Sequence, residues 1–385
     1  AAGTAEAPLA TLREAARRAT PGTRVRVAAG EYGITRTDVQ GEAGAPIAFV
    51  ADGEVVIAAR EGTGWSMSDG AFVVIEGFTI RDAAIHGMNL DDGGDYATPA
   101  HHIVLRNLTI RDAGSGGNND CIKMSGVDDF WIEGSDVAGC DRGEIVDMVG
   151  CHRGVIRGNT FADAVRNGVQ TKGGSADVRI HGNRFRRIPG RAVNAGGSTG
   201  LEFFRPLDAP YEAARIAVVA NVIEDGGEES GAAVAFVGCD ACLAAHNVIL
   251  RPRGWVARIL QESTQDRFVP SRDGRFVNNL VVLDTTQLRS FLNVGTGTAP
   301  ETFVFGHNLW FATNEGASWG GPTLGGGVPA EEGSLVQVDP ALDAEARPGA
   351  GNAAYGAGRA LSETFPDLAG RCYATPPSIG AFAAP

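Results

Sequence analysis

Lysine is almost absent from this chain. Of its 33 lysine and arginine residues, only Lys123 and Lys172 are lysines. Arginine therefore supplies the general surface charge, and a retained lysine suggests a task that arginine performs poorly. A lysine can lose its proton when it is partly buried or lies near another cation, whereas arginine stays charged. Two lysines kept by chance would give the same count, so their surroundings must decide whether either is a catalytic base.

Long apolar segments are also missing. No apolar run approaches the length of a membrane span, although hydrophobic residues make up 43% of the chain and suffice for a large core. The formal net charge of −13 argues against a nucleic-acid partner. The chain starts with Ala1 rather than Met, as a protein does after removal of a signal peptide. We expect a secreted monomer, extracellular or periplasmic, with no membrane or nucleic-acid partner.

Cysteines are few, and six are present: Cys121, Cys140, Cys151, Cys239, Cys242 and Cys372. In a secreted protein some of them would pair, but the connectivity does not follow from the sequence. Cys239 and Cys242 have the spacing of half a zinc site, and no second pair of ligands completes it. A local disulfide between these two cysteines and a pair of unlinked cysteines remain as alternatives.

A short phrase recurs along the chain: a glycine or polar residue, an asparagine, and then a short apolar or β-branched stretch. The copies contain Asn107, Asn159, Asn183, Asn221, Asn247, Asn279 and Asn308. Repeats of this length indicate a solenoid or a propeller, and the short β-branched stretches exclude helical repeats. We predict an all-β fold, a right-handed parallel β-helix in which stacked asparagines form a hydrogen-bonded ladder. A β-propeller is the alternative.

The two ends of the chain differ from the repeats. Residues 9–19 predict a short amphipathic helix ended by Pro21 and Gly22. A solenoid exposes its core at its ends, so a cap is expected there. From about residue 335 the repeat fades into Ala, Gly and Pro. The predicted organisation is a capping segment (1–22), a β-helix catalytic domain (23–334) and a C-terminal extension (335–385) packed on the last coils.

These features resemble the secreted parallel β-helix polysaccharide lyases. The resemblance is carried by the N-terminal helix and the Pro-Gly-Thr-Arg-Val that follows it, by the asparagine coils, and by the closing Ile-Gly-Ala-Phe of residues 379–382. Residues 143–147 (Gly-Glu-Ile-Val-Asp), with Lys172 one coil later, are similar in layout to polysaccharide lyase family 6, the alginate lyases and chondroitinase B. Residues 167–174 (Asn-Gly-Val-Gln-Thr-Lys-Gly-Gly) resemble the lysine coil of family 9 pectate lyases.

The resemblance implies a calcium ion held by acidic residues and a lysine that acts as the base. This chain departs from the family 6 pattern at two positions. Val149 and Gly150 stand where that family has its lysine, and Lys172 stands where it has its arginine. The dense aspartate cluster of family 9 is not clearly reproduced.

Coils aligned on Ser135, Asn159 and Asn183 bring acidic residues together. This alignment stacks Asp120 on Glu144 and Lys123 on Asp147, about 5 Å apart between neighbouring coils. Three carboxylates on one face suit a single hard cation with oxygen ligands. The predicted calcium ligands are Asp120, Glu144, Asp147 and Asn119. The alternative is an ion pair between Lys123 and Asp147 with no metal.

Lys172 is the predicted base. The 24-residue alignment places it over Met148, which would turn its side chain into the core. An outward lysine would then need a local bulge at Gly173 and Gly174. Arg191, which could hold a substrate carboxylate bidentately, and His152, as an acid, complete the predicted catalytic set.

The predicted substrate-binding residues are Arg153, Arg205, Lys123, Asn194 and Gln170. Most of the residues named for the site lie between residues 142 and 205, where cations outnumber acids in an otherwise acidic chain. This local excess indicates a groove for an anionic polymer, or else ordinary solvated charge on outward strand positions.

The expected function is cleavage of a uronic-acid polysaccharide by β-elimination. The reaction needs a base for the proton beside the carboxylate and a cation for the developing negative charge. A glycoside hydrolase is an alternative, with Asp91–Asp92, Asp128–Asp129 or Glu144 and Asp147 as its carboxylates. A second alternative is a C5-epimerase, which shares the first proton abstraction. A third is a non-catalytic carbohydrate-binding β-helix, which needs none of this chemistry.

Overall fold

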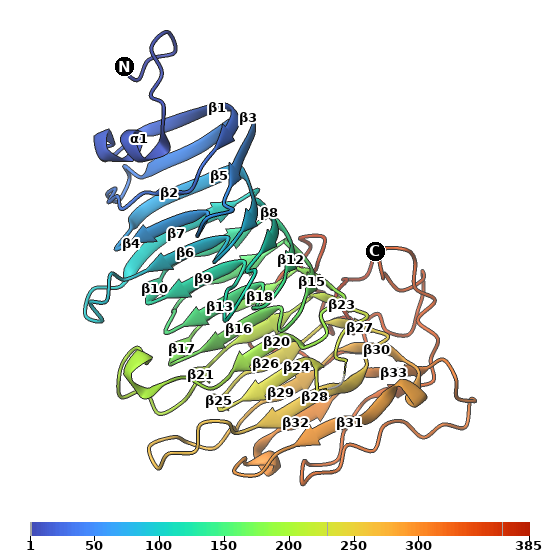
Figure 1. Cartoon of the computed structure of the whole chain (residues 1–385). Coiled ribbons are helices and arrows are strands. Elements are labelled where there is room, and N and C mark those ends of the chain that lie inside the picture. Colours follow the sequence, from blue (N-terminus) through green and yellow to red (C-terminus); the bar gives the residue numbers. More distant parts are fainter. Residues whose placement is uncertain (1, 229, 364) are drawn as a thin grey trace.

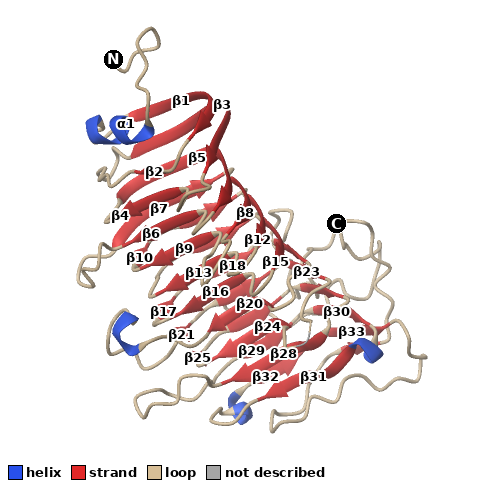
Figure 2. Ribbon diagram, in the orientation of Figure 1, coloured by secondary structure: helices blue, strands red, loops and turns tan. Residues whose placement is uncertain are grey.

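The structure is a computed structural model that describes residues 2–228, 230–363 and 365–385. Its strands pair in parallel, coil upon coil, and form a β-helix that begins at the N-terminal helix (Figure 1). Among the described residues there is one α-helix, and nearly all the remaining regular structure is strand (Figure 2). No helix in this part of the chain is long and apolar enough to cross a membrane. The predicted all-β parallel β-helix is confirmed.

The helix α1 (Leu12–Arg18) covers the first coil. Oγ1 of Thr11 accepts a hydrogen bond from the backbone N–H of Glu14 at 3.2 Å and caps the first turn. Leu12 and Ala16, one turn apart, are the buried residues of the helix and join the core. The helix thus shields apolar side chains that the open end of the solenoid would otherwise expose.

A ten-stranded parallel sheet forms the face that carries the site described below. Its strands are β2 (Thr35–Arg36), β4 (Trp65–Ser68), β6 (Met88–Asp91), β9 (Ile122–Ser125), β13 (Val146–Val149), β16 (Val169–Lys172), β20 (Arg191–Gly196), β24 (Ala232–Val237), β28 (Gly254–Leu260) and β31 (Leu288–Val294).

A three-stranded sheet borders this face and consists of β17 (Ser175–Ala176), β21 (Ala213–Ala214) and β25 (Cys239–Asp240).

The remaining strands form one sheet of 21 strands that bends at the asparagine corner. The strands that precede or cross the corner are β1 (Arg24–Tyr32), β3 (Ile47–Ala58), β5 (Ala71–Ala83), β7 (Ala100–Arg106), β10 (Val127–Asp128), β11 (Trp131–Glu133), β14 (Val155–Arg157), β18 (Arg179–His181), β22 (Ala217–Val219), β26 (Leu243–Ala245), β29 (Arg275–Val277) and β32 (Val304–Gly306).

The strands that follow the corner are β8 (Thr109–Ala113), β12 (Asp136–Cys140), β15 (Thr160–Ala164), β19 (Arg184–Arg186), β23 (Val222–Glu224), β27 (Val248–Leu250), β30 (Leu280–Leu283), β33 (Leu309–Ala312) and β34 (Leu335–Val336). Three short 3-10 helices lie in the connections: η1 (Leu201–Phe203), η2 (Thr285–Gln287) and η3 (Pro300–Thr302).

The asparagine ladder runs through six consecutive coils. Asn183 shows the pattern: its Oδ1 accepts from the backbone N–H of Asn159 at 3.0 Å, and its Nδ2 donates to the carbonyl of Ile156 at 2.9 Å. The ladder continues through Asn221, Asn247, Asn279 and Asn308, all fully buried. At one end Oδ1 of Asn159 accepts from the backbone N–H of Ser135, and at the other the backbone N–H of Asn308 donates to the hydroxyl of Ser334. Each amide satisfies backbone groups that the corner leaves unpaired, so the predicted ladder is confirmed.

Residues 335–385 double back along the outside of the coils. Ile379, Ala381 and Phe382 pack with the outward apolar side chains of coils between Val219 and Leu309. Arg275 pairs with Glu363, and Arg184 pairs with Glu345. The segment therefore covers the side of several coils.

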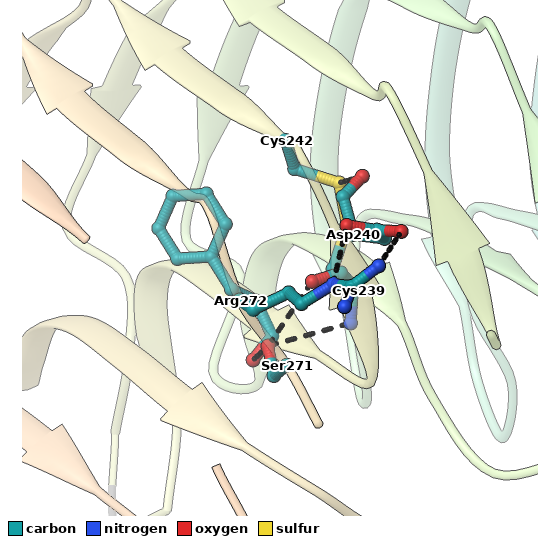
Figure 3. The surroundings of a disulfide bond; sticks show 6 residues. Cys239, Asp240, Cys242, Ser271 and Arg272 are labelled. Carbon is teal, nitrogen blue, oxygen red and sulfur yellow. Dashed lines mark hydrogen bonds and ion pairs between the residues drawn. A yellow bond between two sulfur atoms is a disulfide. The ribbon is translucent and has the colours of Figure 1, made fainter. Parts of the chain in front are cut away.

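Two disulfides and two free cysteines account for all six cysteines. Cys121 is bonded to Cys140 and Cys239 to Cys242, whereas Cys151 is buried and free and Cys372 is exposed and free. Arg272 reaches across to the carboxylate of Asp240, between the two bonded cysteines (Figure 3). Of the alternatives for Cys239 and Cys242, the structure has the local disulfide.

Candidate functional site

The site is built on outward positions of β9, β13, β16 and β20, which lie side by side in the ten-stranded sheet (Figure 1). Asp147 pairs in register with Lys123 on one side and with Gln170 on the other, and Gln170 pairs with Asn194. Asp120 and Glu144 stand just before their strands, and the backbone N–H of Glu144 donates to Oδ1 of Asp120 at 2.9 Å. The predicted stacking of Lys123 on Asp147 and of Asp120 on Glu144 is confirmed.

Three carboxylates meet in this region. Asp120, Glu144 and Asp147 each offer an oxygen within 4.8 Å of the others, and all three side chains are buried. Oδ2 of Asp120 and Oε2 of Glu144 have no hydrogen-bond partner among the described residues. A buried carboxylate oxygen without a partner carries a desolvation penalty, so the cluster is incomplete as it stands.

Lys123 supplies part of the missing charge. Its Nζ pairs with Oδ2 of Asp147 and lies 3.8 Å from Oδ2 of Asp120, and only 17% of the side chain is exposed. The ion pair between Lys123 and Asp147 that the sequence offered as an alternative to a metal is therefore present. It leaves Glu144 uncompensated and does not exclude a metal.

Two acids of the cluster, Asp120 and Asp147, have pKa values shifted in opposite directions. Burial, followed by repulsion from Asp147, raises the pKa of Asp120 to about 8. Burial also opposes ionisation of Asp147, but Lys123 and Lys172 outweigh it and hold the pKa of Asp147 below its ordinary value. Asp120 thus holds a proton at neutral pH unless a further cation is present to replace it.

His86 lies at the edge of this cluster. Its Nδ1 accepts a hydrogen bond from the backbone N–H of Asp120 at 2.9 Å, so the ring proton is on Nε2. Burial and the charge of Lys123 lower the pKa of His86 to about 4. This neutral imidazole was not among the predicted site residues, because only the register places it beside Asp120.

Lys172 faces outward, on the same side of the sheet as Asp147. It pairs in register with Val149, and its Nζ lies 3.3 Å from Oδ1 of Asp147 with 14% of the side chain exposed. The predicted alignment of Lys172 with Met148 is wrong. Met148 pairs instead with Thr171, which points inward.

The reason is the length of one turn. Cys140 pairs with Ala164, and three residues (141–143) then lead to Glu144, whereas two residues (165 and 166) lead from Ala164 to Asn167. The coil from Asp147 to Gln170 therefore has 23 residues, although the asparagine corner keeps a spacing of 24. The one-residue difference turns Lys172 outward. The spacing returns to 24 at Cys151 and Ser175, so one extra residue is accommodated at Gly173 and Gly174, where the sequence analysis expected a local bulge.

An amide network fixes the carboxylate between the two lysines. Nε2 of Gln170 donates to Oδ1 of Asp147 at 2.9 Å, and Oε1 of Gln170 accepts from Nδ2 of Asn194 at 2.8 Å. Oδ1 of Asn194 in turn accepts from Nη1 of Arg191 at 3.0 Å. The second guanidinium nitrogen of Arg191 pairs with Glu262 at 2.8 Å. Gln170, Asn194 and Arg191 are thus linked by hydrogen bonds to the carboxylate that Lys172 contacts.

A buried acid that the sequence analysis missed supports the turn after Lys172. Oε2 of Glu212 accepts from the backbone N–H of Gly173 at 2.8 Å, and Oε1 accepts from the backbone N–H of Thr199 at 2.9 Å. Ser263 also donates to Glu212. Glu212 belongs to a long connection between repeats, so no periodic signal identifies it.

Four predicted site residues are occupied elsewhere. His152 bonds to Asp128 and to the carbonyl of Gly174 around the corner from the acidic cluster. Arg153 binds Asp129 through two nitrogen atoms. Arg205 is buried against Asp92 and lies over the ring of Tyr96. Asn119 directs its amide nitrogen to the carbonyl of Ala84 at 3.5 Å.

The predicted local excess of cations is largely neutralised across coils. Arg153 pairs with Asp129, Arg157 with Glu133, and Arg187 with Asp163. These pairs join residues of neighbouring coils at the outer corners. The free basic groups of the site are therefore fewer than the sequence suggests.

A polar hollow of about 500 Å³ opens above the cluster, lined by side chains that include Glu144, Gln170, Lys172 and Arg191. A hollow of about 580 Å³ lies elsewhere, between the asparagine corner and the C-terminal segment, and contains none of these groups. We therefore place the candidate site in the first hollow.

The donor set of the cluster fits a hard divalent cation. Carboxylate and amide oxygens are the ligands that calcium prefers, and Asp120 and Glu144 each present an unpartnered oxygen. When Asp120 is ionised, the three acids facing two lysines leave one negative charge uncompensated. A cation held by Asp120, Glu144 and Asp147 would remove this imbalance.

Comparisons with known proteins address the fold. Residues 61–205 match the family model of the right handed beta helix region. None of the curated protein sequences matches the chain. Among solved structures, the pectate lyase Pel9A is 14% identical with a TM-score of 0.60, over 99% of this chain and 92% of that one.

Two further structures are similar over most of their length. The polysaccharide lyase Pedsa3628 of family PL6 from Pseudopedobacter saltans is 15% identical with a TM-score of 0.54, over 87% of this chain and 93% of that one. An alginate lyase from Paenibacillus sp. str. FPU-7 is 17% identical with a TM-score of 0.51, over 75% and 96%. At these identities the likeness concerns the backbone. The chain is a right-handed parallel β-helix whose fold is similar to that of pectate and alginate lyases.

Proposed function

We propose that this protein is a polysaccharide lyase that cleaves a uronic-acid polymer by β-elimination. The observation that carries the proposal is the position of Lys172: it faces the polar hollow and lies beside a buried acidic cluster with two unpartnered oxygens. The fold shared with pectate and alginate lyases supports the same reaction class. The two disulfides suit a secreted protein that works in an oxidising compartment.

In the proposed reaction, Lys172 removes the proton on C5 of a uronate, next to its carboxylate. The electron pair of that C–H bond forms the C4–C5 double bond, and the bond to the leaving oxygen on C4 breaks. The leaving oxygen takes a proton from water or an acid. A lysine acts as a base only when neutral, so the cation site at Asp147, the carboxylate that Lys172 contacts, is part of the proposal.

The other residues of the site have supporting roles. Arg191 offers a guanidinium to a substrate carboxylate, although it must share this group with Glu262. Gln170 and Asn194 hold the carboxylate of Asp147 in place through their amides. A calcium ion held by Asp120, Glu144 and Asp147 would neutralise the carboxylate of the substrate as negative charge develops.

A glycoside hydrolase has one observation in its favour, since Glu144 and Asp147 offer oxygens within 4.8 Å of each other near the hollow. Retaining hydrolases place their two carboxyl groups about 5 Å apart. The other candidate acids are engaged: Asp128 and Asp129 bind Arg153, and Asp92 binds Arg205. Elimination therefore accounts better for an outward lysine beside the cluster.

The test is a screen of purified protein on pectate, alginate, chondroitin, hyaluronan and heparan-type chains, with calcium and with chelator. Elimination creates a conjugated double bond that absorbs in the ultraviolet, whereas hydrolysis yields only new reducing ends. We expect unsaturated product on a uronate polymer when calcium is present. Reducing ends without ultraviolet absorbance would establish a hydrolase and refute the proposal.

A further inference from the structure

A second group of cations lies on the same sheet, on the C-terminal side of the site. Arg258 of β28 is in register with Ala235 of β24, which is in register with Asn194. In the adjoining row Arg191, Ala232 and Trp255 are in register. Arg258 and Trp255 therefore continue the two outward rows that contain the amide network and Arg191.

Trp255 holds two guanidinium groups together. Arg258 lies over its ring at 4.2 Å from the centroid, and Arg289 lies over the same ring at 5.3 Å. Cation–π attraction offsets part of the repulsion between the two arginines. Arg258 is half-buried and Arg289 is exposed.

These arginines have no acidic partner of their own. Among the residues that the structure describes, no carboxylate oxygen lies within 4.0 Å of a side-chain nitrogen of Arg258 or Arg289. Nε of Arg258 donates to Oδ1 of Asn293 at 2.9 Å, and Nη1 donates to the carbonyl of Ser230 at 2.5 Å. Burial and the charges of Arg191 and Arg289 lower the pKa of Arg258 to about 10.

The charge balance favours an anion. Arg191, Arg258 and Arg289 carry three positive charges, and Glu262, which pairs with Arg191, carries one negative charge. Glu228 is already paired with Arg253. Among the described residues, these charges sum to about +2, and the hydrogen-bond partners of Arg258 there are the neutral acceptors of Asn293 and Ser230.

We propose that Arg258 and Arg289, positioned by Trp255, form a binding subsite for a carboxylate of the substrate chain. The inference rests on the proposed function, because it places a polymer of acidic sugars along the face that contains Lys172. Arg258 lies three coils beyond the strand of Lys172, or about 14 Å at the usual strand spacing. The substrate then runs along the solenoid axis, and carboxylates of different, non-adjacent sugars of one chain meet the two sites.

The experiment measures binding separately from turnover. Hexamers of galacturonate, mannuronate and guluronate are titrated calorimetrically into the Lys172→Arg variant with calcium present, with and without the added changes Arg258→Gln and Arg289→Gln. We expect each added change to weaken binding of at least one uronate hexamer about tenfold, since a lost charged hydrogen bond has about that effect. Trp255→Ala, which releases both guanidinium groups, is expected to weaken it similarly.

Controls separate the possible outcomes. Arg26→Gln removes one positive charge from an exposed pair with Asp52 in the first coil and should leave binding unchanged. Equal affinity with and without Arg258 and Arg289 would overturn the subsite and leave the lyase proposal standing. Equal losses with a neutral glucose hexamer, or losses only with a sulfated glucan, would also overturn it. Failure of the lyase proposal itself is read from the elimination screen.

Discussion

Nζ of Lys172 lies 3.3 Å from Oδ1 of Asp147, and the other oxygen of the same carboxylate pairs with Lys123. One buried aspartate therefore contacts both lysines of the chain. Lys123 also approaches Asp120 and lies within the acidic cluster. Lys172, in contrast, lines the polar hollow. The two lysines are thus matched in charge and partner and nearly matched in exposure, and of the two it is Lys172 that lines the hollow.

This relationship predicts unequal effects of one substitution. Lys172→Arg keeps the charge and much of the reach but prevents deprotonation, so kcat should fall by about a hundredfold or more. Lys123→Arg should keep most of the activity, because a counterion needs only its charge. Initial rates of double-bond formation measure both variants, and circular dichroism verifies their folding. Activity retained in Lys172→Arg would exclude this residue as the base.

Calcium should stabilise the fold through the acidic cluster. A ligand at a hundredfold excess over its Kd adds about 3 kcal/mol to the free energy of unfolding, which a thermal melt detects. Asp120→Asn should abolish this gain while keeping an acceptor for the backbone N–H of Glu144. Glu144→Gln should act in the same way.

The matched control for the calcium experiment is Asp177→Asn, which removes an exposed acid paired with Arg215. It should leave the calcium-dependent shift in Tm intact. An equal shift in Asp120→Asn and in the unmodified protein would show that calcium binds elsewhere or not at all.

His246 should make stability depend on pH. Its Nδ1 donates to the carbonyl of Ser378 at 2.9 Å, and its Nε2 accepts from Nδ2 of Asn278 at 3.0 Å, so the contact with Asn278 needs the neutral ring. Burial lowers the pKa of His246 from 6.5 to about 4. The unfolded chain therefore binds a proton more readily, and stability is complete above pH 6.5 and lost as the pH falls toward 4.

The expected loss is about 3 kcal/mol across this interval. Urea unfolding at several pH values measures it, and the His246→Gln variant should show a flatter dependence. The C-terminal segment should detach first, since Ser378 belongs to it. Parallel pH profiles for the two proteins would contradict this role of His246.

Replacement of any one asparagine of the ladder should lower the free energy of unfolding. Asn221→Ala removes the acceptor for the backbone N–H of Asn183 and the donor to the carbonyl of Ile180. Buried groups left without partners cost about 1–3 kcal/mol each, so the free energy of unfolding should fall by about 3 kcal/mol. Asn314→Ala, at an exposed position outside the ladder, should change it by less than about 0.5 kcal/mol. Equal effects in the two variants would refute a structural role for the ladder.

Much of the fold could be predicted because its determinants repeat. The asparagine corners, at a spacing of 24 residues between Asn159 and Asn183, were sufficient to stack Lys123 on Asp147. The same reasoning failed for Lys172, because it assumed that every segment of a coil keeps the spacing of the corner. A turn that is shorter by one residue does not alter the spacing of the asparagine corners, so the sequence repeat does not reveal it.

Contacts made by long connections could not be predicted. Arg205 is buried against Asp92, which lies 113 residues earlier in the chain. Glu212 binds the turn at Gly173 from a similar connection. Neither pairing follows from the repeat, so Arg205 was assigned to the substrate and Glu212 was overlooked. The number of free arginines within the coils was overestimated for a related reason, because their acidic partners lie on the neighbouring coil.

The short turn between Ala164 and Asn167 has an evolutionary consequence. Losing one residue there and gaining one at Gly173 and Gly174 shifts which residues stand side by side on the ten-stranded sheet, while the buried corner keeps its spacing of 24 residues. A change in the length of a turn can thus bring different side chains together on the surface without any substitution of those side chains. Insertions and deletions at this turn are accordingly a route by which related solenoids gain or lose a reactive group.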